Sequence, residues 1–148
     1  MKFLYFGVLT LLCQSCFLFG QFKKDRVAFT EDGVQKNYTI IVPKRFNKTE
    51  NRVDSSGNEE HYYSYPDGTL LYFVRAADTS VPYQPINYGV NLPKQLYGTL
   101  FFKGLDSTDH YWRETRFGPY KLGYYAAKPG EDWKFDSALN YFTLRSVR

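Results

Sequence analysis

The chain has 148 residues, of which 20% are aromatic and 23% charged, with a formal net charge of +4. This composition excludes a disordered chain, which would hold few aromatic residues, and a coiled coil, which would be rich in Ala, Glu, Lys and Leu. Two cysteines are too few for a disulfide-dense scaffold, and the mild positive charge does not predict nucleic-acid binding.

The first twenty residues have the pattern of an export signal. Met1-Lys2 supplies one positive charge, residues 3–20 are uncharged and mostly apolar, and the chain turns polar at Gln21. This order is typical of a secretory signal peptide. A membrane-anchoring helix is the alternative, since it needs about 20 apolar residues and the basic residues that follow favour retention. We predict a removable signal over residues 1–20 and an exported protein, periplasmic or extracellular.

Two processing sites compete within this segment. Gly20 places a small residue directly before Gln21, which suits a signal peptidase. The stretch Leu12–Cys16 (LCQSC) resembles a bacterial lipobox, in which a lipidated Cys16 would become the new N-terminus. Because the apolar run continues past Cys16, we favour cleavage after Gly20. The domain then has no thiol chemistry and no cysteine-bound metal, and it contacts a membrane only through the N-terminal segment.

Residues 21–148 are expected to form a single domain. Residues 47–60 are polar and almost free of large apolar side chains, which predicts an exposed loop. Pro82, Pro85 and Pro93 predict that residues 76–95 form neither a regular helix nor a central strand.

Runs of β-branched and aromatic residues predict antiparallel strands. The turn residues Pro66-Asp67-Gly68 and Gly118-Pro119 each lie between two such runs and predict two hairpins. A polar turn is expected at residues 106–109. The predicted strands are residues 38–42, which end before Pro43, and residues 61–65, 69–75, 99–103, 111–117 and 120–126.

The two faces of the last hairpin can be assigned because alternate residues of a strand share one face. Leu122 and Tyr124 are predicted to lie in the core, with Lys121 in solvent. The charged residues that share a face with Trp112 predict that this other face is wet. The residues of the predicted wet face are Trp112, Glu114 and Arg116.

The chain changes periodicity after Pro129-Gly130. Acidic residues at positions 131 and 132 suit a helix N-terminus, and Arg145 and Arg148 suit a C-terminal end. Apolar positions recur at i, i+3, i+4 and i+7, which predicts an amphipathic helix. These positions are Phe135, Ala138, Leu139 and Phe142. The predicted fold class is therefore α+β, a mostly antiparallel β-sheet of two or more hairpins with one C-terminal amphipathic helix packed on it.

Both ends of this domain resemble those of the PsbP/Mog1-like sandwich domains. The stretch Tyr38–Phe46 (YTIIVPKRF) is similar to their opening strand, which is followed by a proline and an aromatic residue. The apolar spacing of Phe135–Phe142 is similar to that of their closing helix. The resemblance implies binding of a ligand or partner rather than a known reaction. The chain as a whole resembles small exported bacterial proteins of unknown function.

The sequence carries no motif of a catalytic, cofactor or nucleotide site. It has no G-x-S-x-G elbow, no P-loop and no G-x-G-x-x-G. His110 and Glu114 would share a strand face, but no third metal ligand accompanies them. Asp106 and Asp109 lack the spacing of a calcium loop. We predict no enzyme activity, no metal and no cofactor.

Aromatic residues crowd the two predicted hairpins. Neighbours such as Tyr111 and Trp112 point to opposite faces, so the aromatic pairs cannot all be core residues of a one-sided sheet. One interpretation is an aromatic platform for a sugar, peptide or apolar ligand, and the other is a second covered face. The candidate ligand-binding residues are Trp112, the leading one, with Tyr111, Tyr125 and Tyr63.

These features favour an exported, non-enzymatic binding or interaction domain for an unknown protein, peptide or glycan. An envelope-anchored structural or assembly protein, held by a lipidated Cys16 or an uncleaved helix, is the alternative. A small hydrolase or metalloenzyme is the least favoured hypothesis.

Overall fold

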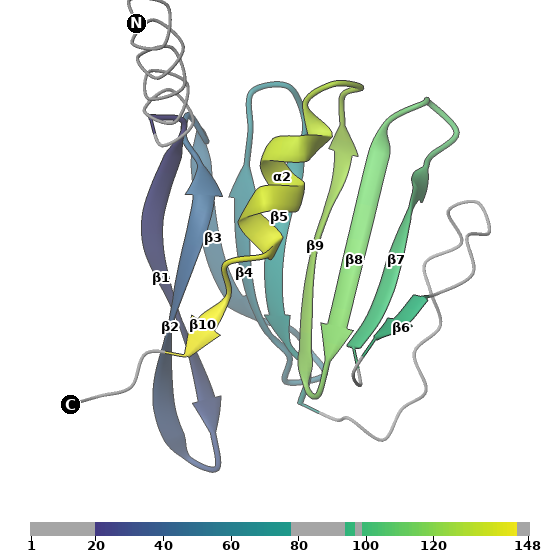
Figure 1. Ribbon diagram of the computed structural model, residues 1–148. Helices are drawn as coiled ribbons and strands as arrows, with labels where there is room; N and C mark the ends of the chain where they lie inside the picture. Colours follow the sequence, from purple (N-terminus) through teal and green to yellow (C-terminus); the bar gives the residue numbers. More distant parts are fainter. Residues whose placement is uncertain (1–19, 78–93, 97–98, 145–148) are drawn as a thin grey trace, which may run out of the picture.

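The computed structural model describes residues 20–77, 94–96 and 99–144. Residues 1–19 of the predicted signal, most of the proline-containing stretch, and Arg145 and Arg148 lie outside these residues. Across the described ranges, no helix is long and apolar enough to cross a membrane. The α+β class is confirmed, since two antiparallel sheets carry one C-terminal helix (Figure 1).

The strands form a small sheet of order β1-β2-β10 and a large sheet of order β3-β4-β5-β9-β8-β7-β6. Every neighbouring pair is antiparallel. The elements are β1 (Phe22–Glu31), β2 (Val34–Pro43), β3 (Lys48–Val53), β4 (Glu59–Ser64), β5 (Leu70–Arg75), β6 (Lys94–Leu96), β7 (Thr99–Leu105), β8 (Tyr111–Phe117), β9 (Tyr120–Ala127), α2 (Asp132–Leu139) and β10 (Thr143–Leu144).

The small sheet is built on a long hairpin, β1–β2, of which the sequence analysis predicted only part of the second strand. Asp32 and Gly33 connect the two strands, and both have positive φ angles, 52° and 75°. A two-residue turn with two positive φ angles matches the twist of a hairpin, and Asp-Gly is among its preferred sequences. Alternate side chains of the hairpin face the large sheet and are buried. They are Val27, Phe29, Tyr38, Ile40 and Val42.

The prediction of a loop over residues 47–60 is wrong, because this stretch contains β3, a turn and the start of β4. β3 is an edge strand of the large sheet and all of its residues are exposed, so its sequence shows no apolar alternation. Its charged side chains are paired, with Lys48–Glu50 at 2.9 Å and Arg52–Glu60 at 2.5 Å. Charges on an edge strand discourage pairing with a second chain.

The two hairpins predicted in the large sheet are confirmed. β4 pairs with β5 across the Pro66–Gly68 turn, and β8 pairs with β9 across Gly118-Pro119. Leu122 and Tyr124 are each 1% exposed, so both are core residues as predicted. Lys121 was expected in solvent but is half-buried, since β9 is an interior strand with neighbours on both sides.

The C-terminal helix is confirmed but is shorter than the apolar spacing predicted. The chain leaves α2 at Asn140 and continues into β10, so Phe142 lies beyond the helix. Its ring still reaches the core and stacks on Tyr38, with 4.6 Å between ring centroids. The buried residues of α2 itself are Phe135, Ala138 and Leu139.

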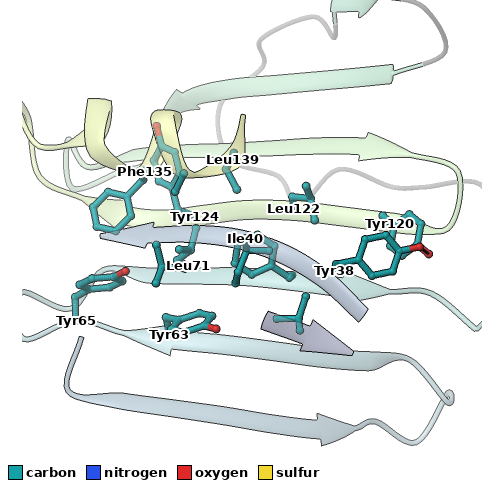
Figure 2. Packing of buried hydrophobic residues seen from close by; sticks show 14 of the residues in the cluster. Tyr38, Ile40, Tyr63, Tyr65, Leu71, Tyr120, Leu122, Tyr124, Phe135 and Leu139 are labelled. Atoms are coloured by element: carbon teal, nitrogen blue, oxygen red, sulfur yellow. Dashed lines mark hydrogen bonds between the residues drawn. The ribbon is translucent and has the colours of Figure 1, made fainter. Parts of the chain in front are cut away.

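The helix and the small sheet cover the same face of the large sheet, and the core lies between these two layers (Figure 1). Figure 2 shows Phe135 and Leu139 of the helix above Tyr124 and Leu122 of β9, with Ile40 of β2 in the same layer of contacts. The Phe135 ring lies 5.5 Å from the Tyr124 ring, centroid to centroid. The opposite face of the large sheet, called the outer face below, points away from this core.

Side chains of β4 form hydrogen bonds with backbone groups of β1 on the edge that does not pair with β2. The backbone N–H of Thr30 donates to the Glu59 carboxylate at 2.9 Å, and the His61 ring nitrogen Nε2 lies 2.9 Å from the Ala28 carbonyl oxygen. These bonds join the two sheets. They also give hydrogen-bond partners to backbone groups on the edge of β1 that has no neighbouring strand among those described.

Candidate functional site

The outer face of the large sheet carries a row of three residues on its central strands. Tyr72 of β5 is paired with Gly123 of β9, and Gly123 is paired with Glu114 of β8. Directly paired residues share a face of the sheet. The neighbours of Gly123 along β9, Leu122 and Tyr124, point into the core, so the row lies on the outer face.

Gly123 allows the Tyr72 side chain to cross β9. A Cβ atom at position 123 would overlap the Tyr72 hydroxyl and would lie 2.5 Å from the Arg113 carbonyl oxygen. Tyr72 uses this space and donates its hydroxyl to Glu114 Oε2 at 2.9 Å. Glycine in a strand interior often marks such a close approach. The carboxylate of Glu114 is therefore held from two strands away.

Glu114 is a buried carboxylate with one satisfied oxygen. The residue is 4% exposed, and its Oε1 has no hydrogen-bond partner in the structure as described. None of the ion pairs within the described ranges includes Glu114. A carboxylate oxygen only accepts hydrogen bonds, and a buried acceptor without a donor costs about 1–3 kcal/mol. The Oε1 atom of Glu114 therefore keeps an unused capacity to accept a hydrogen bond.

The expectation that Trp112 and Glu114 lie on a wet face is wrong. Trp112 is 7% exposed and Glu114 is 4% exposed. The residue paired with Trp112 on β7 is Gly104, which has no side chain to occupy the space of the indole. The charge of Glu114 does not require solvent here, because the Tyr72 hydroxyl replaces part of the water that the carboxylate would otherwise need.

The four predicted ligand-binding residues do not form one platform. Trp112 and the 44% exposed Tyr125 lie on the outer face, whereas Tyr63 is 2% exposed in the core between the layers. Tyr111 lies on the helix side of the sheet, half-buried, with Lys103 Nζ 5.4 Å from its ring centroid. Tyr111 and Arg113 are alternate residues of β8 and therefore share that side.

The roles of Tyr72 and Gly123 are not among the predictions made from the sequence, and Glu114 is buried where the sequence predicts a solvated charge. The available signal was a glycine between leucine and tyrosine in the strand predicted over residues 120–126, because glycine weakens a strand unless a neighbouring group needs the space. The sequence does not reveal that Tyr72 fills the space beside Gly123. Tyr72 and Glu114 come close only because the sheet places β9 between β5 and β8.

His110 and Glu114 have different hydrogen-bond partners in the structure. His110 Nδ1 lies 2.8 Å from the Thr108 hydroxyl in the turn before β8, whereas Glu114 accepts from Tyr72. Among the residues described, no group of three His, Cys, Asp or Glu side chains is placed to hold a metal ion.

Asp136 joins the helix to the large sheet. Its carboxylate accepts hydrogen bonds from Lys103 at 2.6 Å and from Arg113 and Tyr124, each at 3.0 Å. Burial would raise the pKa of Asp136, but the bonds from Lys103 and Arg113 outweigh it and hold that pKa below its usual range. This cluster fixes the helix over β7, β8 and β9.

Glu31 joins the small sheet to β9. Its carboxylate accepts hydrogen bonds from Lys36, Tyr120 and Tyr38. Burial opposes ionisation, yet these bonds outweigh it and lower the pKa of Glu31 from 4.5 to about 2. The pair of tyrosine hydroxyls also lies within hydrogen-bond distance, at 2.6 Å.

Glu31 is expected to make stability depend on pH. Its stabilisation is fully present above pH 4.5 and is lost as the pH falls through about 2, because the folded pKa is the lower one. After allowance for solvent, Glu31→Gln should lower the free energy of unfolding by about 1–2 kcal/mol at pH 7 and by far less near pH 2. Urea unfolding at both pH values measures this, with the exposed Glu50→Gln as a control of near-zero effect. An equal loss at both pH values would contradict it.

The fold and the outer-face row define an α+β domain of two layers with a half-satisfied buried carboxylate on one sheet face. In comparisons with known proteins, the chain matches no family model, no curated protein and no solved structure.

Trp112 is expected to report on the outer face by its fluorescence. In a Trp133→Phe variant, Trp112 emission should be blue-shifted and poorly quenched by acrylamide, because the residue is 7% exposed. In Trp112→Phe, the remaining Trp133, which is 38% exposed, should emit at longer wavelength and be quenched strongly. Strong quenching of Trp112 would show instead that its indole is exposed to solvent.

Proposed function

We propose that this protein is an exported, non-enzymatic binding domain in which Glu114 accepts a hydrogen bond from its ligand at the outer face. The supporting observation is the buried Oε1 of Glu114, which has no donor in the structure as described, while Oε2 is fixed by Tyr72. Such an acceptor is incomplete until a donor arrives. Hydroxyl and amine groups of a glycan or a peptide are donors of this kind.

Trp112 adds an apolar wall beside the acceptor. It lies two residues before Glu114 on β8, about 7 Å along the strand, and on the same face. Large aromatic side chains beside a few fixed polar groups are common in ligand sites. The resemblance to PsbP/Mog1-like domains, which implies ligand or partner binding, supports the same proposal.

Glycan and peptide libraries can test the proposal, with Trp112 emission in the Trp133→Phe variant as the signal of binding. Glu114→Gln keeps the shape of the side chain but replaces a carboxylate oxygen with an amide NH2. A ligand that uses the carboxylate should bind this variant at least about tenfold more weakly, since a hydrogen bond to a charged group contributes about 1.5–3 kcal/mol. Glu60→Gln, a carboxylate of the outer face on β4, is the matched control and should leave binding unchanged.

Two results would contradict the proposal. One is a ligand that binds wild type and Glu114→Gln equally well. The other is a Glu114→Gln variant that is more stable than wild type when no library member changes Trp112 emission. The carboxylate would then be a structural acceptor for Tyr72 and an ordered water.

Export rests on the uncharged residues 3–20, and the envelope-anchored alternative rests on the same stretch and on Cys16. Mass spectrometry of the protein recovered from its native cells separates them. An N-terminus at Gln21 without lipid supports the exported, unanchored domain. An acylated Cys16 or an intact Met1 supports the anchored structural or assembly protein.

A further inference from the structure

Exposed basic side chains gather at the end of the domain where β1 begins and β2 ends. The register pairs Phe22 with Pro43, and the backbone N–H of Lys44 donates to the Gln21 carbonyl oxygen at 2.8 Å. Figure 1 shows the start of β1 and the end of β2 at one end of the hairpin, with its Asp32-Gly33 turn at the other. The fold therefore brings Lys44 and Arg45 next to the first basic residues of β1.

These side chains, called the basic end below, are Lys23, Lys24, Arg26, Lys44 and Arg45. All five are exposed, and Lys23 is paired with Asp25 at 3.3 Å. Within the described ranges the other four form no ion pair. On β3, by contrast, both cations have carboxylate partners. Positive charge is thus left uncompensated at the point where the chain enters the domain.

The residues that precede the basic end are uncharged and mostly apolar over positions 3–20. An uncleaved segment or a lipidated Cys16 would hold the basic end within a few residues of a bilayer. From Cys16 to Gln21 the chain can span at most about 18 Å. Lysine and arginine side chains at that distance meet the negative surface potential of anionic lipids, which attracts them.

We propose that the basic end docks on the anionic lipid headgroups of a membrane surface. This contact uses residues distinct from the Glu114 site and goes beyond the proposed ligand binding. It rests on the envelope-anchored form of the protein, in which residues 1–20 or a lipidated Cys16 hold the domain at the bilayer, and it extends the membrane contact beyond the N-terminal segment. It gives the domain a fixed orientation, with the start of β1 toward the bilayer and the Asp32-Gly33 turn away from it.

Lysine acetylation in nanodiscs tests this orientation with the full chain. The chain is placed in discs of phosphatidylcholine alone or of phosphatidylcholine with phosphatidylglycerol, and acetylation of Lys24 and Lys44 is followed by mass spectrometry. Both should react about fivefold or more slowly in the anionic discs, because each cation near an anionic surface gains about a factor of five in affinity. High salt should remove the difference. Lys36, which is paired with Phe29 near the far turn, is the internal control and should react alike in both discs.

Matched variants separate the basic end from general charge. Arg26→Gln with Arg45→Gln removes two of its five cations while keeping both reporter lysines, and should measurably weaken the slowing in anionic discs. Arg52→Gln, an exposed arginine on β3 with a carboxylate partner, should leave the slowing unchanged. Circular dichroism confirms that each variant is folded.

Three results would overturn the proposal. Equal reaction rates in the two discs would show that anionic lipid is not recognised. Slowing that is as large in the double variant as in wild type would place the contact elsewhere. Equal slowing by soluble polyphosphate in phosphatidylcholine discs would assign the basic end to a soluble polyanion instead of a membrane.

Discussion

Replacing Gly123 with alanine should lower the free energy of unfolding by about 2–4 kcal/mol, measured by urea denaturation. The new Cβ would overlap the Tyr72 hydroxyl and press against the Arg113 carbonyl oxygen, so β9 or the tyrosine must move. Displacing Tyr72 also removes the hydrogen bond to the buried Glu114 carboxylate. The loss therefore combines overpacking with an unsatisfied charge.

Two controls identify the cause of this loss. In a Tyr72→Leu background, Gly123→Ala should cost less than in wild type, because one of the two obstructions is gone. Gly118→Asn lies in the open β8–β9 turn, where a Cβ would meet no atom within 4 Å, and should cost less than about 1 kcal/mol. A Gly123→Ala cost equal to that of Gly118→Asn would show that the sheet accommodates the methyl group easily.

Leu139→Ala should lower the free energy of unfolding by about 2–5 kcal/mol. Leu139 is 5% exposed and lies in the core cluster between the helix and the large sheet (Figure 2). Truncation removes buried apolar surface and leaves a cavity that the antiparallel strands beneath it cannot close. Urea denaturation of wild type and variant at neutral pH measures the difference.

Lys134→Ala on the same helix is the matched control. Its side chain forms a surface ion pair with Glu131, and such pairs contribute at most about 1 kcal/mol. Its effect should therefore be small, whereas a loss below about 1 kcal/mol for Leu139→Ala would show that the helix is peripheral to the stability of the domain.

The hairpins and the helix were predictable because local sequence specifies them. Pro66-Asp67-Gly68 and Gly118-Pro119 favour turns wherever they occur, and the strands on either side pair as neighbours in the chain. The apolar spacing of Phe135 and Leu139 likewise depends only on the helical repeat. The α+β class follows from these local patterns.

The strand conformation of β3 and the position of Phe142 could not be predicted, because both depend on residues that are close in space but distant in the sequence. β3 has no buried side chain, so its strand conformation comes from its pairing with β4 and leaves no apolar pattern in the sequence. Phe142 continues the apolar spacing of the helix, but the residues after it pair with β2 as strand β10 instead of extending the helix. The Phe142 ring consequently stacks on Tyr38 of β2.

Local sequence patterns are enough to predict the turns, the α+β class and the core positions of Leu122 and Tyr124. The burial of Trp112 and Glu114, and the reach of Tyr72 across Gly123 to Glu114, become visible only once the strands are assembled. The difference lies in the range of the interactions. A turn or an amphipathic repeat depends on residues that are close together in the sequence. The solvent exposure of a carboxylate depends instead on which strands lie next to it in the sheet.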